Sequence, residues 1–96
     1  KVAGINSEGI QEVTINAMTG GYVSNVDSIK VGVPTRLKLV TNSTAGCSRA
    51  FTIPKLKYQV TLPATGEEIV EFTPTEKGVL SYTCSMGMYS GRLQII

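Results

Sequence analysis

The chain contains no histidine and no tryptophan, and only two of its 96 residues are cysteine. Without histidine, neither Ser-His-Asp nor Cys-His catalysis has its general base, and a zinc site built on histidine ligands is excluded. The four glutamates between residues 67 and 76 give no support to a hydrolase or transferase, because they follow one strand and loop as a charged solvent face does. We therefore expect a protein that is not an enzyme.

Long apolar runs and concentrated charge are absent as well. No run approaches the roughly 18 apolar residues that a membrane span needs. The net charge is +2, and the lysines and arginines are scattered except for Lys55 and Lys57, which we interpret as a solvated loop or edge; we expect no nucleic-acid partner. No signal peptide is present and the first residue is Lys1, so we expect one processed or excised soluble domain spanning residues 1–96, with any membrane anchor outside it.

The hydrophobic pattern predicts β-strands throughout. Val13, Ile15 and Ala17 alternate with polar residues at the period of a half-buried strand, and the same alternation recurs between turn signals every 8 to 12 residues. No stretch has a helical apolar stripe of useful length. We predict an all-β fold, an antiparallel β-sandwich or small barrel of about seven to eight strands. The expected strands are residues 11–17, 28–33, 36–42, 50–53, 58–62, 67–72, 79–84 and 91–96.

Most of the sulfur is concentrated in one short segment, Cys84-x-Met86-x-Met88. Cys84 shares a strand face with Leu80 and Tyr82, which predicts that it points into the core at the end of its strand. The residues after it leave the strand, so the sulfur loop should lie at one end of the sandwich, where such folds place binding residues. Methionines in a loop are also common as packing residues, and Met18, before a Gly-Gly turn, is expected to pack in the core or the turn.

Cys47 follows a turn and precedes the short strand 50–53, which makes it the candidate partner of Cys84. Two thiolates with one or two thioethers form a soft ligand set that selects Cu(I). A disulfide between the same residues would instead stabilise the fold by about 4 kcal/mol in the chain-entropy treatment. The spacing alone does not choose between the metal pair and the disulfide.

The segment GVLSYTCSMGMYSGRLQII resembles the C-terminal ligand loop of the cupredoxins. Tyr82-Thr83-Cys84, the terminal Met88 and the closing strand from Gly91 occupy the places of that family's motif. Upstream, VDSIKVGVPTRLKLVTNST resembles the family's strand, turn and strand, and AGCSRAFTIP stands where the first ligand, a histidine, is expected. The resemblance runs from about Ile29 to Ile96 and implies a Greek-key, cupredoxin-like β-sandwich.

The departures from the cupredoxin pattern determine the expected metal. A blue copper site uses two histidines, one cysteine and a weak axial methionine. Transferred by position, the ligand set of this chain becomes Cys47, Cys84 and Met88, with Met86 as a substitute or an addition. This thiolate-rich set favours Cu(I), and Cu(II) would oxidise the paired thiolates to a disulfide. Zinc is a rival in vitro, although two cysteines without histidine leave zinc short of ligands.

The resemblance implies a copper-handling module for trafficking, buffering or sensing. Similar soft-ligand domains occur alone or fused to bacterial membrane transport proteins, so we expect an extracytoplasmic location, a membrane tether in the full-length protein and a metal ion as partner. Two alternatives remain open at this point. One is a structural, immunoglobulin-like sandwich with a Cys47–Cys84 disulfide, and the other is a cupredoxin electron carrier.

Overall fold

The computed structural model describes all 96 residues and forms nine strands with two short 3-10 turns. The strands are β1 (Gln11–Met18), β2 (Gly21–Ser24), β3 (Ser28–Ile29), β4 (Thr35–Thr41), β5 (Ala50–Ile53), β6 (Tyr58–Thr61), β7 (Gly66–Phe72), β8 (Gly78–Cys84) and β9 (Ser90–Ile95). The 3-10 turns are η1 (Cys47–Arg49) and η2 (Pro54–Leu56). The chain has no helix with the length and apolar character that crossing a membrane requires.

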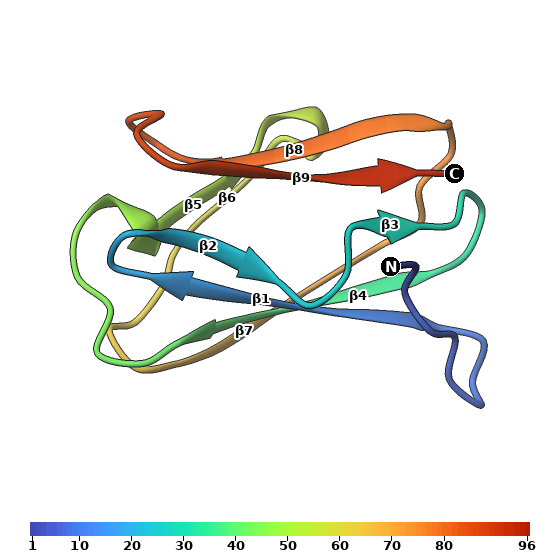
Figure 1. The fold of residues 1–96 in the computed structure, drawn as a ribbon, viewed down its shortest axis with the longest axis horizontal. Coiled ribbons are helices and arrows are strands. Elements are labelled where there is room, and N and C mark those ends of the chain that lie inside the picture. The colour runs from blue at the N-terminus through green and yellow to red at the C-terminus, as the bar shows by residue number, and fades with distance from the viewer.

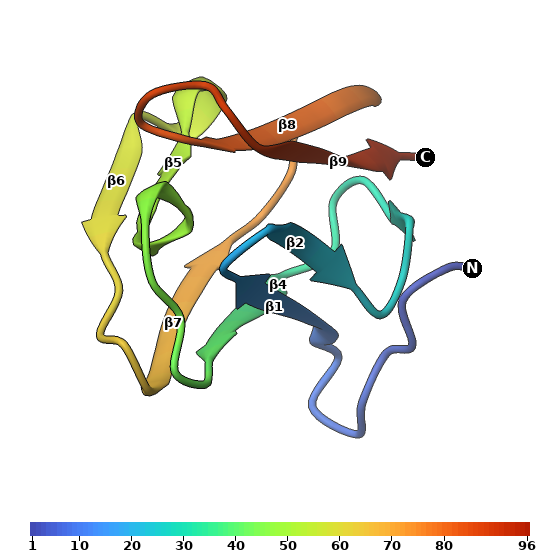
Figure 2. The same ribbon diagram turned by 60° about the vertical axis from the view of Figure 1, so that its left-hand side comes forward.

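Two sheets pack face to face, which confirms the predicted β-sandwich (Figure 1). The first sheet has the order β2-β1-β4-β7, and the second has the order β3-β9-β8-β5-β6. Most neighbouring strands run antiparallel, but β1 pairs with β4 in parallel, and β3 pairs with β9 in parallel. Figure 2 shows the two layers from a second direction, with β8 and β9 above β1, β2 and β4.

The core lies between the sheets and contains one face of each long strand. Strand β4 illustrates the rule: Thr35, Leu37, Leu39 and Thr41 are buried while the residues between them are only partly covered. Alternation of this kind follows from the two-residue side-chain period of a strand. The core cluster comprises 16 residues: Ala3, Val13, Ile15, Ala17, Val26, Ile29, Leu37, Leu39, Phe51, Ile53, Leu62, Val70, Leu80, Tyr82, Leu93 and Ile95.

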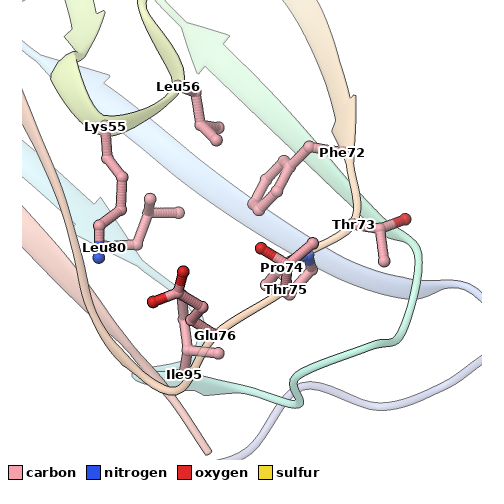
Figure 3. A pocket seen from close by; sticks show the side chains of 9 residues that line it. All are labelled: Lys55, Leu56, Phe72, Thr73, Pro74, Thr75, Glu76, Leu80 and Ile95. Carbon is pink, nitrogen blue, oxygen red and sulfur yellow. The ribbon is translucent and has the colours of Figure 1, made fainter.

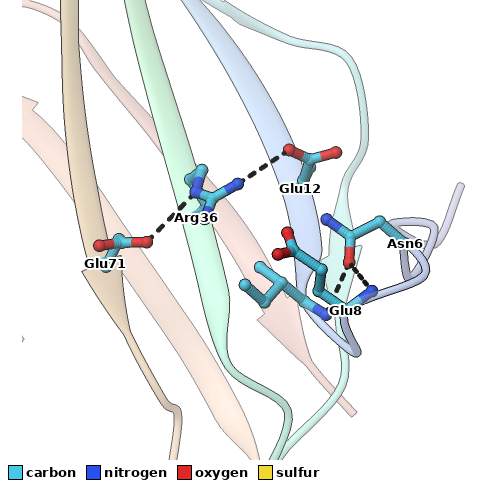
Figure 4. Close-up of polar contacts among 6 residues, drawn as sticks. Asn6, Glu8, Glu12, Arg36 and Glu71 are labelled. Carbon is cyan, nitrogen blue, oxygen red and sulfur yellow. Dashed lines mark hydrogen bonds and ion pairs between the residues drawn. The ribbon is translucent and has the colours of Figure 1, made fainter.

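The outer face of the first sheet carries charges of both signs in register. The Arg36 side chain on β4 bonds to Glu71 on β7 at 3.2 Å and to Glu12 on β1 at 3.4 Å (Figure 4). Before β1 the chain turns at Asn6, whose side-chain oxygen accepts the backbone N–H groups of Glu8 and Ile10 at 2.9 and 3.1 Å. These exposed contacts orient cross-strand neighbours and solvate the sheet, and each adds little to stability.

Three details differ from the sequence predictions. The predicted strand 28–33 ends at Ile29, because the chain turns through Gly32 with a φ of 79°. Strand β2 was not predicted, since its four residues lack a clear apolar alternation. Of the two positions expected for Met18, the core or the turn, the core is wrong, because Met18 is 53% exposed at an outward position of β1 directly before the turn.

Both chain termini lie at the same end of the sandwich, opposite the β8–β9 connection (Figure 1). The N-terminal amine of Lys1 pairs with Asp27 at 2.5 Å, just before β3. At the other terminus, the backbone N–H of Ile96 donates to Ile29 at 2.8 Å. The β8–β9 connection therefore lies at the end of the sandwich farther from both termini.

Candidate metal centre

Cys84 is placed by the alternation of β8. Leu80, Tyr82 and Cys84 are all buried, as the sequence predicts, and Cys84 is only 1% exposed. Its Cα is in register with Phe51 of the neighbouring strand β5. The backbone N–H of Cys84 donates to the carbonyl of Tyr89 at 3.0 Å, which closes the loop that follows. The Cys84 sulfur is therefore held at the boundary of the core by regular sheet pairing.

Cys47 begins the 3-10 turn η1, directly before β5. Gly46 precedes it with a φ of 86°, a conformation that favours glycine and that turns the chain sharply toward Cys47. The Cys47 and Cys84 sulfurs form a disulfide, and the two Cα atoms are 5.7 Å apart. The structure thus brings together the two cysteines that the sequence singles out, and it does so in their oxidised state.

The loop between β8 and β9 carries both candidate methionines. The N–H of Gly87 donates to the carbonyl of Cys84 at 2.9 Å, and Gly87 has a φ of 72°, so the loop is a tight turn. The N–H of Met88 donates to the Cys84 sulfur at 3.2 Å. The side chains of Met86 and Met88 are 75% and 65% exposed. Their backbone is thus adjacent to the disulfide, while their thioethers face solvent.

An aromatic cluster forms the floor beneath the disulfide. The ring centres of Tyr22, Phe51 and Tyr82 lie 5.5 to 5.6 Å from one another, and two of the three pairs are edge-to-face. The Tyr22 hydroxyl donates to the carbonyl of Ser48 at 3.0 Å. Burial raises the pKa of Tyr22 from 10.0 to about 12, with a further contribution from neighbouring Tyr82. The cluster therefore holds η1 through the Tyr22–Ser48 hydrogen bond and lies next to Cys84, since Phe51 pairs with Cys84 and Tyr82 shares its strand face.

No charged side chain occurs in the three segments that surround the disulfide, residues 19–21, 42–48 and 84–91. The segments contact one another: the N–H of Ala45 donates to the Thr19 hydroxyl at 3.1 Å, and the disulfide joins Cys47 to Cys84. We call these three segments the sulfur end. Its available ligands are soft sulfur atoms, hydroxyl groups, the Asn42 amide and backbone groups.

A separate hollow of about 280 Å³ lies toward the other end of β8. Figure 3 shows Leu56, Phe72 and Leu80 on its apolar side, with Lys55 and Glu76 at its rim. The Lys55 amine donates to the carbonyl of Val79 at 3.2 Å, so this cation already has a structural partner. The hollow contains no sulfur ligand and does not belong to the sulfur end.

The fold and the sulfur end together define a cupredoxin-like protein. The family described as "Cupredoxin-like domain" matches residues 3–96, and the chain belongs to that family. The predicted resemblance and the predicted fold class are therefore confirmed. A search among curated proteins gives no match.

Two solved structures illustrate the relationship. One is the metal binding domain of the Streptococcus pneumoniae D39 Cu(I) exporting P-type ATPase CopA, solved with Cu(I). It is 23% identical to this chain, with a TM-score of 0.83, and the match covers 99% of this chain and 93% of that chain. At that identity the likeness shows the fold. The other is an NMR solution structure of a copper binding protein in the apo form, with 28% identity, a TM-score of 0.87 and coverage of 100% and 96%.

Sequence reasoning did not find the groups that support the cysteines. Tyr22 lies on the unpredicted strand β2, and nothing in the sequence indicates that its hydroxyl reaches Ser48. The contact from Met88 to the Cys84 sulfur is made by a backbone N–H group, which every residue except proline has. The only indication of this contact in the sequence was that Met88 follows Cys84 by four residues.

Proposed function

We propose that the reduced, dithiol form of this domain binds Cu(I) through Cys47 and Cys84. The observation that carries the proposal is that these two sulfur atoms meet at the sulfur end, next to a loop with two exposed methionines. A pair of thiolates with thioethers nearby is a soft ligand set, and soft ligands prefer Cu(I) to harder divalent ions. Copper is cargo in this proposal, and the role of the domain is to hold and pass it.

The surroundings of the cysteines favour Cu(I) over zinc. No group of three or more His, Cys, Asp or Glu side chains gathers anywhere in the structure. A structural zinc site generally uses four nitrogen, sulfur or oxygen ligands in a tetrahedron, and here only two thiols are available. Cu(I) accepts fewer and softer ligands, so the cysteines with one or two methionines are sufficient. Zinc binding in vitro would need water or a neighbouring molecule.

Met88 is the first choice among the thioether ligands, and Met86 is an addition or a substitute. The N–H of Met88 already lies 3.2 Å from the Cys84 sulfur, which places its Cα close to the metal position. Both side chains are largely exposed, so neither must leave a packed site to turn toward the cysteines. Methionine has three flexible side-chain bonds, and rotation about them costs little in an exposed loop.

We extend the proposal to copper handling in an extracytoplasmic setting, as trafficking, buffering or sensing, with a membrane transport protein as partner or fusion. The support is the printed description of one structural neighbour as a domain of a Cu(I) exporting P-type ATPase, and of the other as a copper binding protein. A role in binding, not catalysis, is consistent with the absence of histidine from the chain.

The test is an anaerobic Cu(I) titration of the reduced protein against a chromogenic Cu(I) chelator. We expect tight binding by the wild type and a loss of affinity of about 100-fold or more in Cys47→Ser and in Cys84→Ser, because each change removes one thiolate. Met18→Leu is the matched control, since Met18 is an exposed methionine that points away from the core on β1. Full affinity in both cysteine variants would refute the proposal.

The disulfide also favours a second candidate, a cupredoxin-like domain in which Cys47–Cys84 is a permanent structural link. Counting free thiols in protein that is purified anaerobically and then denatured separates the two. A permanent link predicts no free thiols and no Cu(I) binding until the fold is disrupted, whereas the copper proposal predicts that reduction leaves a folded protein with two free thiols. An electron carrier is less well supported, because no imidazole is present to hold Cu(II).

A further inference from the structure

The two halves of the disulfide are not equally accessible. Cys84 is 1% exposed, and its residue is enclosed by the core and by the turn that follows it. Cys47 is only partly buried, and its neighbours Ala45 and Gly46 are exposed. A disulfide is broken by in-line attack of a thiolate on one of its sulfur atoms, so access decides which sulfur atom is attacked.

The sulfur of Cys84, the more enclosed residue, also has a hydrogen-bond donor that can stabilise negative charge on it. The N–H of Met88 donates to the Cys84 sulfur at 3.2 Å. A hydrogen bond to an ionised acceptor is stronger than one to a neutral acceptor, so this contact strengthens when Cys84 becomes a thiolate. No hydrogen bond to the Cys47 sulfur is present among the contacts of the molecule. The contact therefore favours Cys84 as the leaving group.

The surface around Cys47 does not repel an incoming thiolate. Residues 42–48 and 84–91 contain no aspartate or glutamate. The nearest charged residue along the chain is Arg49, whose Nε donates to the Leu62 carbonyl at 2.8 Å. The turn that presents Cys47 is held in place, since the Thr44 hydroxyl donates to the Ala17 carbonyl at 2.6 Å.

We propose that the sulfur end is a thiol–disulfide exchange site for a dithiol reductant, with Cys47 as the attacked residue. One thiolate of the reductant attacks the Cys47 sulfur, the bond between Cys47 and Cys84 breaks, and Cys84 leaves as a thiolate. The second thiol of the reductant then displaces Cys47 from the mixed disulfide. Two electrons and two protons pass from the reductant to the protein; the reductant becomes a disulfide and the domain a dithiol.

This inference rests on the proposed function for its consequence. The oxidised domain has no free thiol, so neither cysteine can act as a thiolate ligand until the exchange has occurred. Reduction therefore controls when the domain accepts Cu(I). The chemistry at Cys47, however, does not depend on copper and can be tested without it.

The test uses the oxidised wild-type protein and reduced glutathione as a monothiol probe. The reaction is stopped with acid, free thiols are alkylated, and trypsin separates the cysteines onto peptides 39–49 and 78–92, because Lys38, Arg49, Lys77 and Arg92 are the flanking cleavage sites. We expect glutathione on peptide 39–49 and the alkyl group on peptide 78–92, with a preference of about tenfold or more from the difference in access. Equal labelling, or the reverse pattern, overturns the proposal.

Two controls make the result specific. In concentrated guanidinium chloride the preference should disappear, because the fold no longer shields Cys84; a preference that persists would also overturn the proposal. In the folded single-cysteine variants, Cys47 of Cys84→Ser should react with an aromatic disulfide reagent about tenfold faster than Cys84 of Cys47→Ser, and equal rates would overturn it.

Failure of this inference is distinguishable from failure of the proposed function. If peptide mapping shows attack at Cys47 but the reduced protein binds no Cu(I), the copper proposal fails and the exchange site stands. If the reduced protein binds Cu(I) but mapping shows attack at Cys84, the exchange site as proposed fails and the copper proposal stands.

Discussion

The two ends of the sandwich are closed by different chemistry. At the end where β1 begins, the Gln11 side chain is completely buried, and its amide donates to Lys30 O and Thr35 Oγ1, both at 2.9 Å. The Gln11 oxygen accepts the N–H of Lys30 at 2.9 Å, so one side chain binds both ends of the connection between β3 and β4. At the sulfur end, where β1 finishes, the corresponding link is the Cys47–Cys84 disulfide.

The difference between these ends indicates where the molecule can change state. The Gln11 contacts are noncovalent, and the amide has no group that a reductant changes. The disulfide is a covalent link that a thiol reductant can cut, and the loop with the exposed methionines follows Cys84 directly. One end is thus closed by side-chain hydrogen bonds, and the other by a covalent bond that, within the proposed function, reduction opens for Cu(I).

Reduction of the disulfide should have the largest effect on stability. The link joins residues that are 37 positions apart, and its loss should lower the free energy of unfolding by about 4 kcal/mol through the added freedom of the unfolded chain. Denaturant unfolding with and without an anaerobic reductant measures this difference. The Cys47→Ser/Cys84→Ser double variant is the control and should not respond to the reductant. An unchanged midpoint in the wild type would show that the sulfur end does not depend on its covalent link.

Removal of the Gln11 amide should lower the free energy of unfolding slightly less than reduction of the disulfide does. Gln11→Leu removes the acceptor of the Lys30 N–H and the side-chain donor of the Lys30 carbonyl, which we expect to cost about 3 kcal/mol of unfolding free energy. Gln59→Leu is the matched control, because Gln59 is exposed on β6 and should change stability by less than about 0.5 kcal/mol. If both variants unfold at the same denaturant concentration, the buried amide does not close its end.

A methyl group at Gly91 should disturb the aromatic floor of the sulfur end. Gly91 pairs with Tyr82 across β8 and β9, and a Cβ at Gly91 would come within 2.5 Å of the tyrosine ring. Gly91→Ala should therefore destabilise the protein by about 2 kcal/mol, as overpacking does. Gly20→Ala is the control, since a Cβ there meets nothing within 4 Å. Thermal or denaturant unfolding compares the two, and equal stability would contradict the packing argument.

The three methionines should differ in their effect on Cu(I) binding, and the N–H contact of Met88 with the Cys84 sulfur puts Met88 first. Within the proposed function, Met88→Leu should weaken Cu(I) binding by about tenfold, which equals about 1.4 kcal/mol, because it removes a thioether but keeps the size of the side chain. Met86→Leu should have a smaller effect, and Met18→Leu none. The chelator titration measures all three. A larger loss in Met86→Leu than in Met88→Leu would reverse the assignment of the first thioether ligand.

The smallest expected effect is on stability at alkaline pH, and it arises from Tyr22 in the aromatic cluster. The pKa of Tyr22 is raised from 10.0 to about 12 by burial and by Tyr82, so the folded protein keeps this proton where the unfolded chain loses it. The resulting stabilisation is complete below pH 10 and declines as the pH rises toward 12. In Tyr22→Phe, the unfolding midpoint should fall less steeply over this interval than in the wild type. An identical slope would show that Tyr22 is not shielded in solution.

Much of the fold could be predicted from sequence because the apolar alternation is regular in the long strands. Leu37 and Leu39 on β4 and Leu80 and Tyr82 on β8 are buried as the pattern predicts. Short elements were harder, because β2 and β3 contain too few residues to show a period. The parallel pairing of β1 with β4 is a long-range feature, and local sequence does not encode it.

Of the candidate site, the sequence predicted only the residues that carry sulfur. The inward position of Cys84 followed from the period of β8, and the disulfide shows that Cys47 lies beside it. The oxidation state did not follow, because the same two thiols suit a metal or a disulfide. The sequence also did not predict that the two cysteines differ in exposure. This difference arises because Cys47 lies in the 3-10 turn η1, outside the sheet, whereas Cys84 lies in strand β8.

The placement of both termini at the Gln11 end has a mechanical consequence (Figure 1). Any segment joined to either terminus would attach at that end, and the longest dimension of the domain is 33 Å. The sulfur end would then lie at the opposite end of the domain from the attached segment. In such an arrangement the cysteines and methionines could meet another molecule without the tether standing between them.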